Sequence, residues 1–147
     1  MHFPTRYFVL LPLTAAISLL TVSCGESKIS QCNKIIKIAN DAVSEAKSLT
    51  NGTQASDTKA MVQAAKAMEK ASKDMAAIKV KDEKLKNYQS GFIKMYGDTS
   101  KATRDFVAAF DRKDRPAAET ALTNLQQATT PEKQLVADIN TYCSGNQ

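Results

Sequence analysis

The chain has 147 residues, a length typical of one small domain, with 20 Lys and Arg against 15 Asp and Glu and a net charge of +5. Charges of both signs are interspersed, so the clustered basic footprint of a nucleic-acid-binding protein is absent from the sequence. The only histidine is His2, and the chain beyond it excludes histidine-dependent triads, His-ligated zinc and Glu-x-x-His di-iron sites.

Residues 1–23 have the pattern of an export signal. Arg6 supplies a positive charge, residues 7–22 carry no charge, and Ser23 is a small residue at a potential cleavage point. The uncharged segment is interrupted by Pro12 and is shorter than the about 20 residues that a membrane-spanning helix needs. We therefore expect the signal to be cleaved, with a retained membrane anchor as the alternative.

The motif Thr-Val-Ser-Cys at residues 21–24 resembles the lipobox of bacterial lipoproteins, in which the signal is cut before a cysteine that is then acylated. Thr21 stands where that family prefers leucine, although Leu19 and Leu20 keep the region apolar. The resemblance implies acylation of Cys24, for example by palmitate, and stable attachment to a membrane. It implies no fold and no activity.

The same resemblance implies an exported protein with residues 24–28 as a lipidated tether on the periplasmic or cell-surface side of a bacterial membrane. Gly25 follows the cysteine where some bacteria use aspartate as an inner-membrane retention signal, so the choice between the inner and outer membranes stays open. The alternative is an ordinary secreted protein in which Cys24 merely lies near the cleavage site.

From Ile29 onward, apolar residues recur at helical spacing and strand signals are nearly absent, which predicts an all-α domain. The first predicted helix ends at Asn51-Gly52, because both residues tolerate positive φ. Methionines and alanines dominate the core face of the second, a combination that fills irregular gaps and allows close approach. The four predicted helices span residues 29–50, 56–79, 82–112 and 114–143.

Aspartates at two positions predict helix starts: Asp82 caps the third helix, and Asp114, in the turn at 111–116, caps the fourth. The apolar seam of the third helix continues in phase across Gly97, which favours one helix over two. Thr130, followed by Pro131, predicts a second start, so the fourth helix is kinked or split near the proline. Residues 144–147 form a frayed tail.

Four long helices joined by short turns predict an antiparallel up-down-up-down four-helix bundle over residues 29–143, since a two-helix coiled coil would need longer unbroken heptads. This topology brings Cys32 and Cys143 to the same end, and an exported chain meets an oxidising compartment where a disulfide persists. The bridge would stabilise the fold by up to about 4.7 kcal/mol. The spacing is not Cys-x-x-Cys, so we expect a structural disulfide.

Because Cys24 lies close to Cys32 in the sequence, the disulfide end of the bundle is expected to face the membrane. The turn between the second and third helices belongs to that end and is rich in lysine, and each lysine near an anionic surface contributes about 1 kcal/mol of attraction. The alternative is a solvated lysine-rich turn. The candidate lipid-contacting residues are Lys73, Lys79, Lys81, Lys84 and Lys86.

With no catalytic residue, metal site or cofactor identified, the sequence predicts a membrane-tethered, non-catalytic interaction or accessory module. Its partners would be the membrane, through Cys24, and an unidentified protein of an envelope or membrane complex, but not nucleic acid. The alternative is a binder of a small apolar ligand between the helices. The side chains that would line such a site could instead simply form the packed core. The candidate lining residues are Met68, Met75, Tyr88, Phe92 and Met95.

Overall fold

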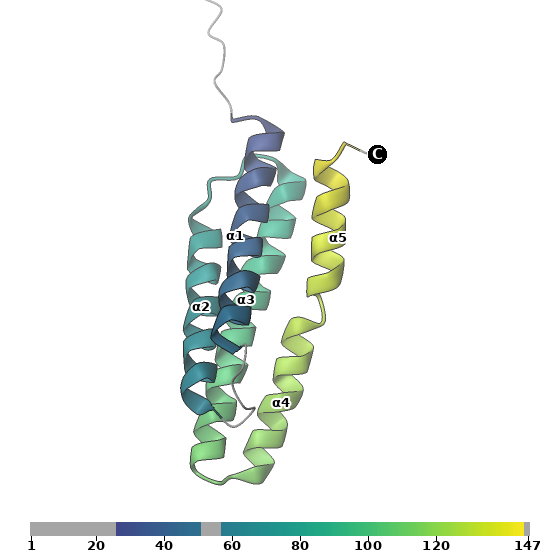
Figure 1. Cartoon of the computed structure of the whole chain (residues 1–147). Coiled ribbons are helices and arrows are strands. Elements are labelled where there is room, and N and C mark those ends of the chain that lie inside the picture. The colour runs from purple at the N-terminus through teal and green to yellow at the C-terminus, as the bar shows by residue number, and fades with distance from the viewer. Residues whose placement is uncertain (1–25, 51–56, 146–147) are drawn as a thin grey trace, which may run out of the picture.

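The computed structural model describes residues 26–50 and 57–145 and contains five α-helices (Figure 1). No strand occurs in these two ranges, which confirms the predicted all-helical class. The predicted signal and lipobox, with Cys24, and the Asn51-Gly52 helix stop lie outside the described residues. The helices are α1 Lys28–Thr50, α2 Thr58–Ala77, α3 Glu83–Asp111, α4 Arg115–Thr129 and α5 Glu132–Cys143.

Aspartate side chains begin three of the helices. Each accepts the backbone N–H three residues later, which satisfies one of the donors that a helix start leaves unpaired and contributes about 1 kcal/mol. The predicted caps at Asp82 and Asp114 are confirmed, and Asp57 takes the same position before α2. The N···O distances are 3.1 Å for Ala60 to Asp57, 2.9 Å for Leu85 to Asp82 and 3.1 Å for Ala117 to Asp114.

Helix α3 is continuous through Gly97, as the in-phase apolar seam predicted. It ends where Lys113 adopts a left-handed conformation with φ of 57°. The N–H groups of Lys113 and Asp114 then donate to the carbonyls of Phe110 and Ala109, both at 2.9 Å, which satisfies the last carbonyls of the helix. The chain turns here into α4, within the predicted turn at 111–116.

The segment that follows Asp114 forms two helices, α4 and α5. The prediction that Thr130 caps the second of them is wrong: its hydroxyl donates back to the Gln126 carbonyl at 2.8 Å, and its N–H bonds the same oxygen at 3.1 Å. Thr130 therefore closes α4. Pro131 takes the position before α5, which begins at Glu132 without a side-chain cap.

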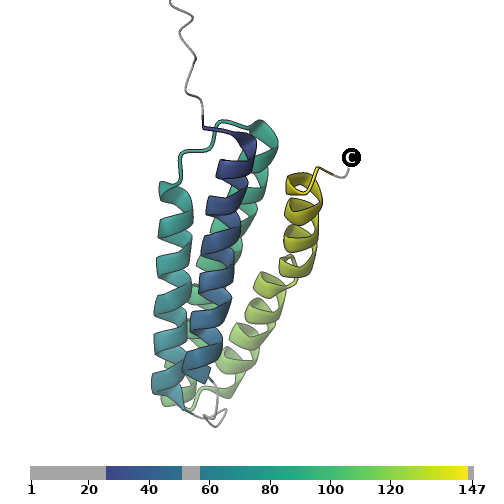
Figure 2. The same ribbon diagram turned by 45° about the horizontal axis from the view of Figure 1, so that its top comes forward.

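The long helix α3 packs along both α2 and α4, α1 packs on α2, and α5 contacts α1 and α3. Figures 1 and 2 show the start of α1, the α2–α3 connection and the end of α5 at one end of the molecule. We call this the disulfide end (residues 26–35, 75–92 and 135–144). The turn from α3 into α4 lies at the opposite end, and we call residues 102–129 the distal region.

Large buried side chains are concentrated at the disulfide end. The five largest with under 2% exposure are Phe92, Ile35, Met75, Leu85 and Cys32. Buried positions of the distal region hold small residues instead, namely Ala102, Thr103, Val107, Ala109, Ala121 and Ala128. Within the described ranges, none of the five helices combines the length and apolarity that crossing a membrane requires.

Candidate functional site

A disulfide joins Cys32 near the start of α1 to Cys143 at the end of α5, with the two Cα atoms 5.9 Å apart. It closes a sequence separation of 111 residues and confirms the pairing predicted from topology. Cys32 is 1% exposed and belongs to the main apolar cluster, so the bridge lies on the core of the disulfide end.

Gln31, next to Cys32, connects α1 to the α2–α3 connection. Its side chain is among the few buried polar groups, and its Oε1 accepts the N–H groups of Lys81 at 2.6 Å and Asp82 at 3.2 Å. Its Nε2 donates to the Glu26 carbonyl at 3.0 Å. Sequence reasoning missed Gln31, because a polar residue beside an apolar seam carries no signal of a partner fifty residues away.

Asp82 has a second role besides capping α3, since its Oδ2 accepts the hydroxyl of Tyr142 on α5 at 2.8 Å. The Leu85 N–H is the main cause that holds the pKa of Asp82 below its ordinary value, and the Tyr142 hydroxyl adds to this effect against the opposing effect of burial. The same bond raises the pKa of Tyr142, because ionised Tyr142 would face the Asp82 carboxylate. The pair ties α5 to the start of α3.

Two lysine side chains lie over the ring of Tyr142. The Nζ atoms of Lys28 and Lys84 lie 3.8 Å and 4.7 Å from its centroid, and the ring of Tyr88 lies 6.0 Å away. Cations over an aromatic face at such distances are attracted by the ring quadrupole. Three segments of the chain therefore meet at Tyr142, and positive charge is held at the disulfide end.

The five lysines proposed to contact lipid lie in different surroundings. Lys73 pairs with Glu69 at 2.6 Å on α2, outside the disulfide end, and Lys86 pairs with Glu83 at 2.6 Å. Lys84 stacks on Tyr142. The remaining two, Lys79 and Lys81, are exposed in the α2–α3 connection.

The first turn of α1 adds an apolar side chain and an ion pair to this end. Ile29 is 64% exposed, the largest value among the large hydrophobic residues described. Glu26 pairs with Lys34 at 2.6 Å, and this bond is the main cause that lowers the pKa of Glu26. The surface around the start of α1 therefore carries an exposed isoleucine beside several lysines.

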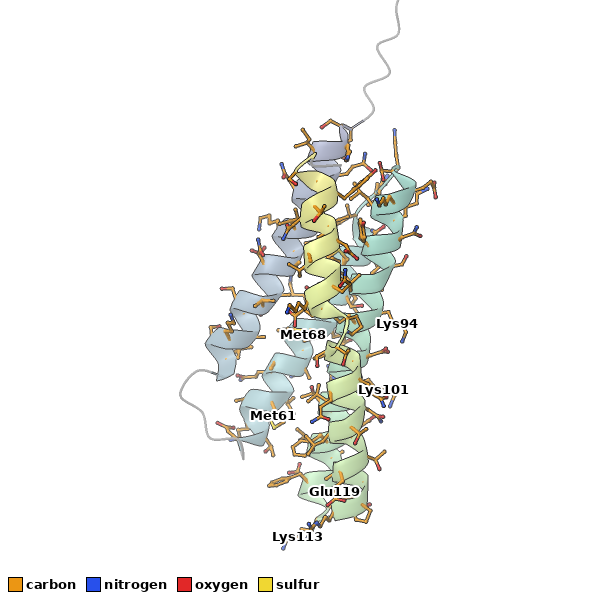
Figure 3. The ribbon with its side chains drawn as sticks, turned by 90° about the vertical axis from the view of Figure 1, so that its right-hand side faces the viewer. Met61, Met68, Lys94, Lys101, Lys113 and Glu119 are labelled. Atoms are coloured by element: carbon orange, nitrogen blue, oxygen red, sulfur yellow. A yellow bond between two sulfur atoms is a disulfide. The ribbon has the colours of Figure 1, made fainter. Side chains whose placement is uncertain are left out.

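The five candidate ligand-lining residues do not surround one cavity. Met75 and Phe92 are 0% and 1% exposed within the main apolar cluster, and Tyr88 is half-buried beside Tyr142. Only Met68 and Met95 border open space. Figure 3 shows Met68 on α2 at the level of the junction between α4 and α5.

That open space is a groove of about 270 Å³ to which all five helices contribute. Its existence follows from small residues on α1 and α2 at the level where α4 ends and α5 begins. Its apolar lining consists of Val43, Ala46, Ala64, Met68 and Met95. Its polar lining consists of Lys47, Tyr96, Thr99, Thr103, Thr129 and Glu132.

Tyr96 is the most buried polar residue of this groove, with 3% exposure and its ring stacked on Phe92 at 5.9 Å. Burial is the main cause that raises the pKa of Tyr96 well above its ordinary value, and the nearby Glu132 carboxylate adds to it. The hydroxyl therefore stays protonated at physiological pH. Sequence reasoning missed Tyr96, which follows Met95 and lies one position off the apolar seam.

Within residues 26–50 and 57–145, no group of three or more His, Cys, Asp or Glu side chains is placed to hold a metal ion. Two other features of this part of the chain could serve a function, namely the basic disulfide end and the groove beside Tyr96. Comparisons of the chain with protein-family models, with curated proteins and with solved structures found no match.

Proposed function

We propose that this protein is an exported bacterial lipoprotein in which residues 1–23 are removed and Cys24 is acylated. The bundle, in up-down-up-down order, serves as a non-catalytic module that holds a protein partner near the membrane. The observation that carries the proposal is the position of the start of α1, which lies at the same end as the disulfide and the α2–α3 connection (Figure 1).

The tether limits the distance between this end and the lipid. Only residues 25–27 separate Cys24 from the first residue of α1, and four Cα steps reach at most about 14 Å at about 3.3–3.6 Å each. The disulfide end therefore stays close to the surface. Its exposed Ile29 and the exposed Lys79 and Lys81 suit an interface of apolar chains and anionic head groups.

Acylation is tested on the full chain expressed in a bacterium and extracted from its membranes. Mass spectrometry of the amino-terminal peptide should show a chain that begins at Cys24 and carries acyl groups. The Cys24→Ala variant should lack both the acyl groups and the cut before residue 24. An unmodified Cys24, or an amino terminus elsewhere, contradicts the proposal.

Orientation is tested with tryptophan as a depth reporter, because the natural chain contains no tryptophan. In vesicles that contain anionic lipids, brominated acyl chains should quench Ile29→Trp and leave Phe110→Trp, in the distal region, unaffected. Changing Lys79, Lys81 and Lys84 together to Gln should reduce quenching at residue 29. Equal quenching at both positions would contradict a bundle that stands on its disulfide end.

In this orientation the distal region faces away from the lipid and presents the exposed Phe110 and Leu122 to a partner. A photoreactive residue at Leu122 should then yield a cross-linked species in intact cells, and the same residue at the exposed Lys37 on α1 should not. Native mass spectrometry of the detergent extract should show the corresponding complex. Recovery of the chain alone in both experiments contradicts the module function.

A further inference from the structure

The groove beside the α4–α5 junction has the composition of a small-molecule site. Its volume of about 270 Å³ lies just below the range of about 300–1,000 Å³ that is usual for such sites, so an occupant must be small. Val43, Ala64, Met68 and Met95 provide apolar contacts from three helices. Methionine side chains adapt their shape to an occupant, which suits a groove that holds a ligand mainly by apolar contacts.

The hydroxyl group of Tyr96 indicates that the groove could hold a hydrogen-bonding ligand. No described residue makes a hydrogen bond with it, although the residue is only 3% exposed. Every fully buried side-chain nitrogen or oxygen in the described part of the chain has a partner. The Tyr96 oxygen must therefore reach the open space of the groove, where a ligand oxygen can bond it.

The charges around the groove select among ligands. Glu132 lies near enough to Tyr96 to act on it electrostatically, so an anionic head group bound at the hydroxyl would be repelled. The lining contains one acidic and one basic residue, Glu132 and Lys47, so it has no net charge that would favour a cation. Two of the groove residues, Tyr96 and Thr103, carry buried hydroxyl groups. Thr103 donates to the Thr99 carbonyl at 2.8 Å, so Tyr96 is the buried hydroxyl that is left to donate to a ligand.

We propose that this groove binds a small, uncharged, mainly hydrocarbon molecule with one hydroxyl group, which accepts a hydrogen bond from Tyr96 and places its apolar body against Met68 and Met95. Such a molecule can also donate its own hydroxyl hydrogen toward Glu132. This inference does not depend on the membrane tether, and it adds a ligand to a bundle that the preceding proposal treats only as a protein-binding module.

The test is photolabelling of the full chain in lipid vesicles with a diazirine-substituted 1-octanol. Peptide mapping should place the label on the segments that contain Met68 and Met95. Unlabelled 1-octanol should compete at least about tenfold more effectively than octanoate at equal free concentration. Cys24→Ala should be labelled equally, so failure of the lipoprotein proposal would not affect this result.

Two variants connect the label to the proposed contacts. Tyr96→Phe keeps the ring and removes the hydroxyl, and should weaken 1-octanol competition about three- to tenfold, the loss expected for one hydrogen bond. Ala64→Leu fills the groove and should abolish the label at both methionines. Tyr88→Phe, which alters a tyrosine outside the groove, is the matched control and should leave labelling unchanged.

Circular dichroism should show a helical fold for each variant and an unchanged melting transition for Tyr96→Phe, because this variant preserves the stacked ring. Absence of label at Met68 and Met95 in the natural chain would mean that the groove holds only water, and would overturn the proposal. So would equal competition by octanoate, or undiminished competition in Tyr96→Phe.

Discussion

At the disulfide end, Met75, Leu85 and Phe92 are at most 1% exposed, although Ile29 on its surface is 64% exposed. The distal region buries no side chain as large as these to that degree, and its Phe110 and Leu122 are 47% and 41% exposed. The two regions use similar amphipathic helices. The difference is in the number of neighbours: α1, α2, α3 and α5 meet at the disulfide end, while α4 packs chiefly on α3 (Figure 2). A two-helix contact buries one stripe of each helix and leaves the rest in solvent.

The small residues of the distal region fit this geometry. Alanines such as Ala109 and Ala121 let α3 and α4 approach closely, but they bury little apolar area. Stability should therefore be concentrated at the disulfide end, and local opening should begin in the distal region. In the proposed orientation, the molecule would then combine a rigid end near the membrane with a more easily opened end that faces the proposed partner.

The largest expected effect compares two phenylalanines. Phe92→Ala should lower the free energy of unfolding by about 3–5 kcal/mol, because it leaves a cavity in a packed cluster. Phe110→Ala, its matched control, removes a half-exposed ring whose aromatic neighbour is Phe106 at 6.0 Å, and should cost under about 1 kcal/mol. Urea unfolding followed by circular dichroism measures both, and equal losses would abolish the contrast between the regions.

Removing the disulfide should have the next largest effect. The double variant Cys32→Ser/Cys143→Ser should lose about 2–4 kcal/mol, because the unfolded chain regains the entropy of a loop that spans 111 residues. Reductant should destabilise the natural chain by the same amount and leave the double variant unchanged. Non-reducing peptide mapping provides the direct check, and free thiols at both positions would contradict the structure.

The third effect concerns the two aspartate caps. Asp82→Ala removes the cap of α3 and the acceptor of the Tyr142 hydroxyl, and should cost about 1–2 kcal/mol. Asp114→Ala removes an exposed cap with a single bond, and should cost about 0.5–1 kcal/mol. Thermal unfolding at neutral pH distinguishes them, and a larger loss at Asp114 would contradict the role of Asp82 as a link between helices.

The stabilisation contributed by Asp82 should depend on pH. The pKa of Asp82 is lowered from 3.8 in the folded protein, so its stabilisation is fully present above that pH and is lost as the pH falls through the lowered value. Asp82→Asn should therefore flatten the acid limb of the stability curve relative to the natural chain. An unchanged acid limb would mean that Asp82 has no preferred partner in the folded state.

Much of the fold was predictable, because apolar periodicity and aspartate caps act locally. The pattern that defines the seam of α3 depends only on residues three and four apart, so its continuity through Gly97 could be predicted. The disulfide followed from topology once helix directions were assigned. Thr130 was mispredicted because its hydroxyl had two possible partners, the N–H groups ahead and the Gln126 carbonyl behind, and sequence does not rank them.

The candidate site was less predictable, because it depends on contacts between distant segments. The apolar faces of the second and third predicted helices placed Met68 and Met75 together with Phe92 and Met95. Which part of the space between the helices stays open as a groove depends on the volumes of Ala46 and Ala64 and on the level at which α4 ends. Likewise, the pairing of Lys73 with Glu69 follows from helical spacing, whereas the stacking of Lys84 on Tyr142 requires α5 to be in place.

The smallest expected effect comes from alanine substitutions at two glycines of α3, which test how closely α5 packs on that helix. A Cβ atom at Gly97 would lie 3.6 Å from Ser72 Oγ, an ordinary contact, so Gly97→Ala should stabilise the fold by about 0.5–1 kcal/mol through helix propensity. A Cβ at Gly91 would lie 2.7 Å from Leu135 Cδ2 on α5, so that side chain would have to leave its position.

Displacing Leu135 should offset the stabilisation that alanine contributes through its higher helix propensity, since an off-rotamer side chain costs about 0.5–1.5 kcal/mol. Gly91→Ala should therefore be about 1 kcal/mol less stable than Gly97→Ala by thermal unfolding. In a Leu135→Ala background the two glycine substitutions should become equivalent, because the clash is gone. If they are already equivalent in the natural background, α5 does not contact α3 at Gly91, and the rigid disulfide end would be limited to α1, α2 and α3.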